Sequence, residues 1–198
     1  MTTTATGHLG PAPETGDARR LYDRDADRLG YVMNLSRVWA HRPSLHTGLF
    51  ALAEDAATTA GLTVRQRGVF IVAGASTAGD AYCSLAWGRK LAGETDPETA
   101  AAVVRGDDAG LDPADRALAA WARAVVRDPN ATEPADLEPL RAAGYDDERI
   151  LAITVFVVAR RAFAAVNDAL GAVPDEVLYS PGPLRDAVTY GRQDPQKP

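Results

Sequence analysis

The chain has 198 residues and a formal net charge of -6; 46% of its residues are hydrophobic, but only 7% are aromatic. This length suits one sizeable domain with a well-formed core. The chain is acidic overall and has no cluster of basic residues, so neither nucleic acid nor a membrane surface is expected as a partner. The single cysteine, Cys83, excludes an internal disulfide and a multi-cysteine metal site, and it fits a reducing cytoplasm.

The chain is predicted to be one domain between two tails. Residues 1–19 are rich in Thr, Gly and Pro, have no apolar signal-peptide core, and are predicted to form a flexible tail. Residues 193–198 are predicted to form a second tail. Alanine is frequent between them and no segment reads convincingly as a strand, so residues 20–192 are predicted to form an all-α bundle of about seven or eight helices.

The first helices are predicted from charge, caps and apolar spacing. Residues 20–30 are highly charged and allow a short helix, and Asn34 is expected to cap a segment that runs to His41. Pro43 suits the first turn of a helix that ends before Gly61. One face of that helix is predicted to be buried, formed by Leu45, Leu49, Leu52 and Ala56.

Later helices begin at recognisable capping sequences. Thr63 and Gln66 match a capping box for a helix that continues towards Gly79. Three more helices are expected after Asp96-Pro97, after Asp112-Pro113 and after Asp146, and Thr132 is expected to cap a short helix over residues 133–143.

The helix after Asp146 is the longest and the most apolar. Its apolar window, residues 150–173, would suit a membrane span by length alone, but Arg160, Arg161, Asn167 and Asp168 interrupt it. We therefore predict a central core helix, or one shared between subunits. The two arginines would pair across a subunit interface or extend their charged ends to solvent.

The candidate catalytic residues lie where two helices meet. Gly79 permits a break and Asp80 is a strong N-cap residue, which places Cys83 at the third position of a new helix. Free N–H groups and the helix dipole there favour a thiolate, and Asp80 could act as a general base. The alternatives are that Cys83 is a small buried residue and that Asp80 is only a cap.

Further residues are candidates for a substrate pocket around this helix start. Ser84 and Trp87 share a helical face with Cys83, Tyr82 could stack on a substrate, and Arg67 could bind a carboxylate. The aromatic residues could equally belong to the core, and Arg67 could meet solvent or an acidic neighbour. The three histidines show no spacing suited to one metal ion, so neither a metal nor another cofactor is expected.

Several segments carry a resemblance to a known family. They are Asn34-Leu35-Ser36-Arg37-Val38, His41-Arg42-Pro43, Leu62-Thr63-Val64-Arg65-Gln66-Arg67, Ala81-Tyr82-Cys83 and Ala164-Ala165-Val166-Asn167-Asp168-Ala169-Leu170-Gly171. Over roughly residues 30–175 the chain resembles the AhpD-like superfamily, also called the carboxymuconolactone decarboxylase family, and especially its peroxidase-related branch.

The resemblance implies an AhpD-like helical bundle and an antioxidant, peroxidase or alkylhydroperoxidase type of oxidoreductase. Redox members carry a CxxC pair at a helix start, a histidine one turn beyond and a glutamate on the preceding helix. Here Cys83 matches the second cysteine, Asp80 replaces the first, Trp87 replaces the histidine, and Arg65-Gln66-Arg67-Gly68 occupies the glutamate region. A dithiol relay needs two sulfurs, so one cysteine would need an external thiol reductant.

Three hypotheses follow from these residues. The first is a peroxidase-like oxidoreductase that uses Cys83 on a small-molecule substrate. The second is a cofactor-free lyase, isomerase or cyclase that uses Asp80 as acid or base in the same pocket. The third is a non-catalytic, ligand-binding oligomer. In each case the protein is expected to be cytoplasmic. A homo-oligomer is also expected, because helices that are apolar on most sides need a partner surface. The resemblance implies a dimer, trimer or hexamer.

Overall fold

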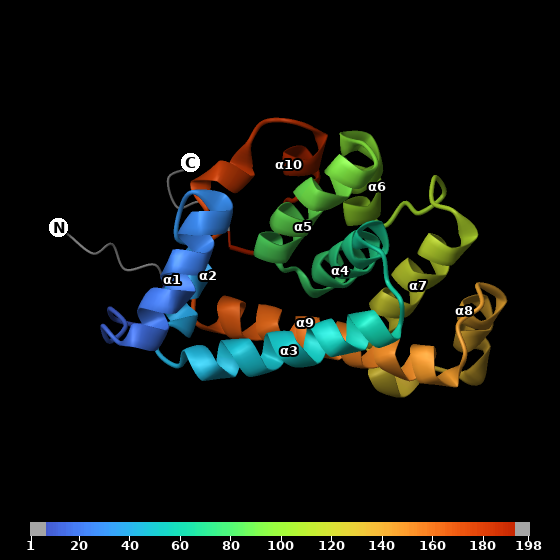
Figure 1. The fold of residues 1–198 in the computed structure, drawn as a ribbon. Coiled ribbons are helices and arrows are strands. Elements are labelled where there is room, and N and C mark those ends of the chain that lie inside the picture. The colour runs from blue at the N-terminus through green and yellow to red at the C-terminus, as the bar shows by residue number, and fades with distance from the viewer. Residues whose placement is uncertain (1–6, 193–198) are drawn as a thin grey trace.

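The computed structural model describes residues 7–192, so residues 1–6 and the predicted tail 193–198 lie outside the described part of the chain. The described residues form an all-α bundle without a strand, as predicted (Figure 1). The α-helices are α1 (Gly16–Leu29), α2 (Asn34–Trp39), α3 (Pro43–Thr59), α4 (Val64–Ala78), α5 (Ala81–Glu94), α6 (Pro97–Arg105), α7 (Pro113–Arg127), α8 (Glu138–Ala142), α9 (Asp147–Ala169) and α10 (Pro183–Ala187). Short 3-10 helices cover Pro129–Ala131, Pro134–Leu137 and Glu176–Tyr179.

Helix α1 begins earlier than the sequence suggested. It starts at Gly16, inside the segment expected to be a tail, because the Thr15 side chain caps it by accepting a hydrogen bond from the N–H of Ala18 at 3.1 Å. The methyl group of Ala18 is buried in the core, which anchors this end of the chain.

Two predicted caps are wrong. Asn34 is the first residue of α2 rather than its cap, which is Met33, and the Asn34 amide donates to the carbonyl of Val173 instead. Thr132 does not cap the segment that follows it, because its hydroxyl donates to the Pro129 carbonyl at 3.0 Å. The predicted helix over residues 133–143 is instead a 3-10 turn that leads into α8.

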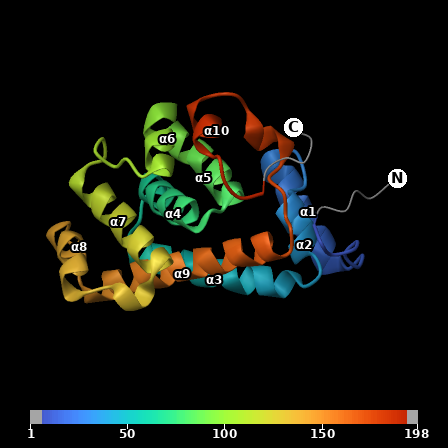
Figure 2. The same cartoon turned by 180° about the vertical axis from the view of Figure 1, so that it is seen from behind.

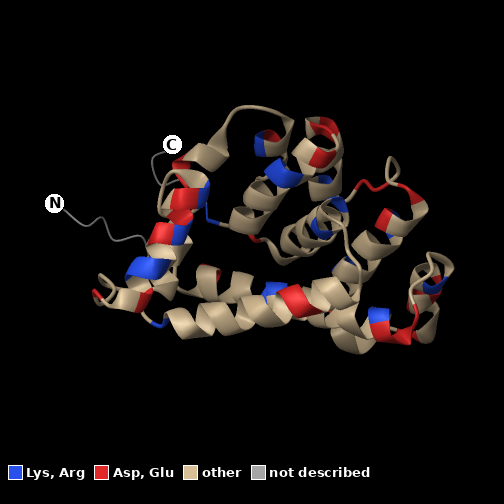
Figure 3. Ribbon diagram, viewed as in Figure 1, with Lys and Arg blue, Asp and Glu red and all other residues tan. Residues whose placement is uncertain are grey.

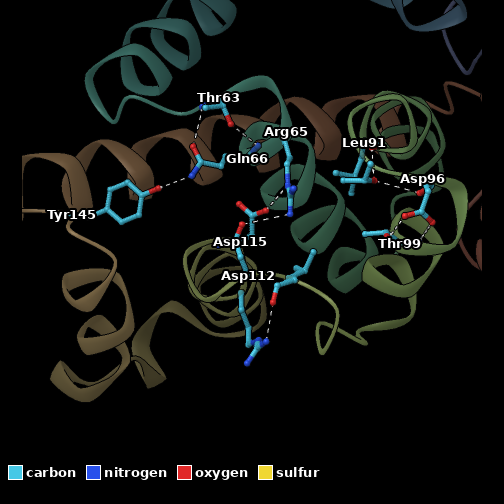
Figure 4. A network of polar contacts seen from close by, with 12 residues as sticks. Thr63, Arg65, Gln66, Leu91, Asp96, Thr99, Asp112, Asp115 and Tyr145 are labelled. Carbon is cyan, nitrogen blue, oxygen red and sulfur yellow. Dashed lines mark hydrogen bonds and ion pairs between the residues drawn. The ribbon is translucent and has the colours of Figure 1, made fainter.

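The other predicted caps are confirmed. The side chains of Asp96, Asp112 and Asp146 each accept a hydrogen bond from the backbone N–H three residues later. The capping box of Thr63 and Gln66 begins α4, and Figure 4 shows how this helix start is tied to its neighbours. These backbone N–H groups would otherwise have no partner, so the caps fix where each helix begins.

The helices pack in two groups. Helices α3 and α9 lie antiparallel and side by side along one edge of the molecule, as Figures 1 and 2 both show. Helix α4 packs against α5 and α7, and α6 packs against α5 and α10. Helix α4 also contacts α9, so the core lies between the two groups. The start of α5 lies near the middle of α9, because Arg160 of α9 contacts the Cys83 sulfur.

The predicted buried stripe of α3 is wrong at two of its four positions, since Ala56 is buried and Leu49 packs partly buried against the core. Leu45 is 63% exposed and Leu52 is 50% exposed, whereas His46 and the small residues Ala53, Ala56 and Ala57 are buried. Small side chains let α3 approach α9 closely, and this contact leaves Leu45 and Leu52 on the outside. Which apolar face of a helix is buried depends on its neighbours, and the spacing of residues within one helix does not contain that information.

Helix α9 is a core helix that also has an apolar outer face. Its length and composition would allow it to cross a membrane, but 56% of its most apolar stretch is buried against the rest of the protein, which fits a soluble protein. Leu151 and Val158 of α9 remain exposed, seven residues apart, as do Leu45 and Leu52 of α3. Figure 3 shows that few charged residues interrupt these two helices, whereas α1 is densely charged.

Candidate active site at the start of helix α5

The candidate site is built on the break between α4 and α5. Gly79 ends α4 in the left-handed conformation, at a φ of 73°. Asp80 is the N-cap of α5, as predicted, and its Oδ1 atom accepts a hydrogen bond from the N–H of Cys83 at 3.0 Å. This bond holds the carboxylate beside the residue that carries the sulfur.

Asp80 is completely buried, and only one of its oxygens has a partner. Its exposure is 0%, and its Oδ2 atom has no hydrogen-bond partner within the described residues. Burial raises the pKa of the Asp80 carboxyl, and hydrogen bonds from the backbone N–H and the thiol of Cys83 oppose this rise. An oxygen in this state can receive a proton or accept a hydrogen bond from a ligand.

The Cys83 thiol lies between an acidic and a basic group. Burial, followed by the charge of Asp80, raises the pKa of the thiol well above its usual range, and the charge of Arg160 opposes the rise. Nη2 of Arg160 lies 3.8 Å from the sulfur. The resting residue is therefore a thiol at neutral pH, although the helix start by itself favours a thiolate.

Cys83 lines a pocket even though it is only 4% exposed. The pocket contains about 320 Å³ of empty space, including its opening to solvent. Asp80, Cys83, Arg160 and Arg161 are the charged residues and the cysteine among those that line it. The rest of the wall is apolar and comes from α4, α7 and α9: Phe70, Ile71, Ala75, Ala78, Val126, Val157 and Ala164, with Gly74 beside them. Cys83 is thus a buried residue that borders this space.

Arg160 lines the site, although the sequence did not predict it as a site residue. Its guanidinium carbon lies 5.2 Å from the ring centre of Phe163 and 5.5 Å from those of Phe50 and Trp87. Aromatic faces attract a guanidinium, so these rings hold the side chain at the pocket. The signal in the sequence was the pair of arginines in an apolar helix, but the sequence did not show which residues they meet.

The other predicted pocket residues are placed as follows. Trp87 contacts Arg160 beside the pocket without lining it. Tyr82 and Ser84 are buried on other sides of α5: the Tyr82 hydroxyl donates to Asp175, and Ser84 accepts from the Tyr190 hydroxyl at 2.9 Å. The structure therefore brings Asp80, Cys83 and Trp87 together around Arg160.

The side chains of Arg65, Gln66 and Arg67, at the start of α4, contact neighbouring segments rather than the pocket. Arg67 lies away from the pocket and binds both carboxylate oxygens of Glu54, at 2.7 and 2.9 Å. Arg65 donates to Asp115 at 2.7 Å, and the Gln66 side chain donates to the Tyr145 hydroxyl at 3.3 Å (Figure 4). These contacts join α4 to its neighbours.

A second carboxylate lies near the site, but the described residues offer no metal-binding cluster. The Asp168 carboxyl of α9 has its pKa raised to about 6, first by burial and then by the charge of Asp80. Among residues 7–192 there is no group of three or more His, Cys, Asp or Glu side chains that could hold a metal ion.

The fold is similar to those of several solved structures. A peroxidase-related protein from Ralstonia eutropha JMP134, described as an alkylhydroperoxidase AhpD core, has a TM-score of 0.77 and 26% identity, over 88% of this chain and 95% of its own. A peroxidase-related protein from Silicibacter sp. TM1040 has a TM-score of 0.77 and 21% identity, over 91% of this chain and 97% of its own. Both are described as uncharacterized.

A third similar structure is a cysteine-to-alanine variant of the debrominase Bmp8 in complex with 2,3,4-tribromopyrrole. It has a TM-score of 0.72 and 16% identity, over 95% of this chain and 98% of its own. No protein-family model and no curated protein matches the chain. From its helices and these neighbours, the chain has the fold of the AhpD-like superfamily, as the resemblance implied.

Proposed function

We propose that this protein is a single-cysteine oxidoreductase that reduces hydroperoxides, an antioxidant activity. The observation that carries the proposal is the arrangement of Asp80, Cys83 and Arg160 at a pocket open to solvent. The arrangement supplies a sulfur nucleophile, a proton acceptor and a cation to stabilise the thiolate. The fold that the chain shares with peroxidase-related proteins supports the proposal.

In the first step the Cys83 proton moves to Asp80, and the thiolate forms beside Arg160. The sulfur attacks one peroxide oxygen and the O–O bond breaks. The departing alkoxide takes the proton from Asp80, so the products are a sulfenic acid at Cys83 and an alcohol. Asp80 suits both transfers because the raised pKa of its carboxyl brings it closer to neutral pH.

In the second step an external thiol restores Cys83. One thiol attacks the sulfenic acid, which releases water and leaves a mixed disulfide at Cys83. A second thiol attacks this disulfide, which restores the Cys83 thiol and releases the oxidised thiol as a disulfide. The co-reactant must be external because the chain has one cysteine, and a reducing cytoplasm would supply it.

The direct test is peroxide consumption with a dithiol donor, together with mass spectrometry after dimedone labelling of sulfenic acid. The wild-type protein should consume an organic hydroperoxide and gain the label at Cys83. Cys83→Ser, which keeps the side-chain size, should lose both signals. Consumption that is unchanged in Cys83→Ser would overturn the proposal, and no second cysteine can confuse the result.

A second candidate is cofactor-free acid–base catalysis by Asp80, of the lyase, isomerase or cyclase type. Two observations favour it: the pKa of the Cys83 thiol is raised, and the Oδ2 atom of buried Asp80 has no partner among the described residues. Turnover of a small organic substrate that survives Cys83→Ala but not Asp80→Asn would select it. The debrominase crystallised with a small halogenated pyrrole supports a small-molecule substrate for either candidate.

A further inference from the structure

Arg160 carries a positive charge that is not neutralised by an ion pair. The ion pairs found among residues 7–192 include neither Arg160 nor Arg161, although both line the pocket. Asp80 attracts Arg160 from beyond ion-pair distance, and the charges that act most on Asp168 after that of Asp80 are Arg161 and Arg192. The guanidinium of Arg160 therefore has no carboxylate partner within ion-pair distance among the described residues.

The residues around Arg160 hold its side chain in place but leave one of its N–H donors without an acceptor among the described residues. Phe50, Trp87 and Phe163 pack around the guanidinium, and its buried Nε–H has no acceptor among the described residues. A buried donor without a partner costs free energy, and a ligand that supplies an acceptor recovers it. Arginine binds carboxylates through two parallel hydrogen bonds, so a carboxylate is the matching chemical group.

Cations lie around Arg160 as well as the carboxylates of Asp80 and Asp168. Lys90 lies 4.2 Å from the ring centre of Trp87, the ring that also contacts Arg160. The exposed Arg161 lies on the wall of the pocket. Several cations beside an apolar cavity raise the local concentration of small anions.

A second and independent observation points to a donor on the ligand. The Oδ2 atom of Asp80 is fully buried, belongs to a residue that lines the pocket, and has no hydrogen-bond partner within residues 7–192. When ionised, this oxygen can accept an O–H group of a ligand. The remaining wall is apolar, so the rest of the ligand should be hydrocarbon.

We propose that the pocket takes a compact organic anion whose carboxylate binds Arg160 and whose hydroxyl or hydroperoxyl group donates to Asp80. The hydroperoxyl form rests on the proposed function and would make the substrates hydroperoxides of small organic acids. The hydroxyl form would then be the reduced product, which is stable enough to use as a probe.

The test is calorimetric binding of 3-hydroxybutyrate, butyrate and 3-hydroxybutyramide to the reduced protein. The amide is a neutral analogue of the hydroxy acid, and butyrate lacks the hydroxyl. We expect the hydroxy acid to bind about tenfold or more tightly than the amide, which corresponds to about 1.4 kcal/mol. It should also bind more tightly than butyrate. Equal affinities for the hydroxy acid and the amide, or no saturable binding of any probe, would overturn the proposal.

Variants show whether Arg160 is the source of the preference for the hydroxy acid over the amide. Arg160→Gln should reduce the preference for the anion to near unity, and Arg160→Lys should keep part of it. Arg149→Gln removes the same charge from an exposed position of α9 outside the pocket and should keep the full preference. Thermal unfolding establishes that each variant is folded. A preference that persists in folded Arg160→Gln would overturn the assignment.

The same titration on Cys83→Ala separates this inference from the proposed function. If Cys83→Ala prefers the anion while the wild-type protein consumes no peroxide, the redox proposal fails and the ligand assignment stands. If the wild-type protein consumes neutral and acidic hydroperoxides equally well and shows no preference in binding, the ligand assignment fails and the redox proposal stands.

Discussion

The N–H of Cys83 donates to the Oδ1 atom of Asp80 at 3.0 Å, so the residue that begins α5 also controls the charge beside the sulfur. Structural and chemical roles are thus combined in one carboxylate. As a cap, Asp80 fixes the first turn of α5. As a buried charge, it opposes ionisation of the thiol and offers a place for its proton.

Asp80→Asn should separate these two roles, because asparagine caps a helix about as well as aspartate but carries no charge. The pKa of the Cys83 thiol should fall, as measured from the pH dependence of its alkylation by iodoacetamide. Peroxide turnover should nevertheless fall by about 10²-fold, because the proton donor to the alkoxide is lost. Turnover equal to or above that of the wild type would show that Asp80 takes no part in proton transfer.

Asp168 should make the stability depend on pH. The folded protein holds the proton of this carboxyl up to its raised pKa of about 6, whereas the unfolded chain releases it near 3.8. The unfolded state therefore binds fewer protons between these values, and the contribution of Asp168 to the free energy of unfolding falls as pH rises through this range.

Asp168→Asn should remove this dependence. The side chain is only half-buried, so solvent screens part of the effect of its charge. The free energy of unfolding should therefore rise by about 1 kcal/mol at pH 7. Urea unfolding of both proteins at several pH values measures the difference. The assignment would be contradicted if the free energy of unfolding of the variant fell further below that of the wild type as pH rose from 4 to about 6.

Gly191→Ala should be strongly destabilising, because the chain near residue 191 packs against the α4–α5 break. A Cβ atom there would lie 2.5 Å from the carbonyl oxygen of Gly79 and 2.9 Å from the nitrogen of Ala81. Gly144→Ala is a matched control, since its φ is also positive but a Cβ would meet nothing within 4 Å.

We expect Gly191→Ala to lower the free energy of unfolding by about 1–3 kcal/mol more than Gly144→Ala, measured by urea unfolding. The rate of Cys83 alkylation should also change in Gly191→Ala, because the break that positions Asp80 must shift. Equal losses in the two variants would mean that backbone conformation alone matters at residue 191.

We also propose that exposed apolar residues of the adjacent helices α3 and α9 contact a second copy of this chain, which would give the homo-oligomer expected from the sequence. They are Leu45, Leu52, Leu151 and Val158. Light scattering should give a mass at least twice the chain mass of 20.9 kDa. Leu52→Glu combined with Leu151→Glu should reduce the mass to that of one chain, because two charges would be buried at the contact.

Val64→Glu is the control for this experiment, since Val64 is 54% exposed in the first turn of α4. It adds a charge to another apolar surface residue and should leave the mass unchanged. A wild-type protein with the mass of one chain would rule out the proposed contact.

The sequence by itself determined where most helices begin. The caps at Thr63, Asp80, Asp96, Asp112 and Asp146 satisfy backbone groups within a few residues, so their effect is local and can be read from neighbouring letters. The same local reasoning placed Asp80 and Cys83 together at one helix start. It failed at Asn34 and Thr132, whose side chains have other partners.

Only the tertiary structure decided which helix faces are buried and what stands opposite the sulfur. Leu45 and Leu52 of α3 are exposed because α9 packs against the small residues of α3, and no pattern within α3 records that choice. Arg160 is 77 positions from Cys83 in the chain, yet it reaches the sulfur because α9 crosses the break between α4 and α5. Contacts of this kind depend on how helices dock, which is set by the shapes of both partners rather than by either segment alone.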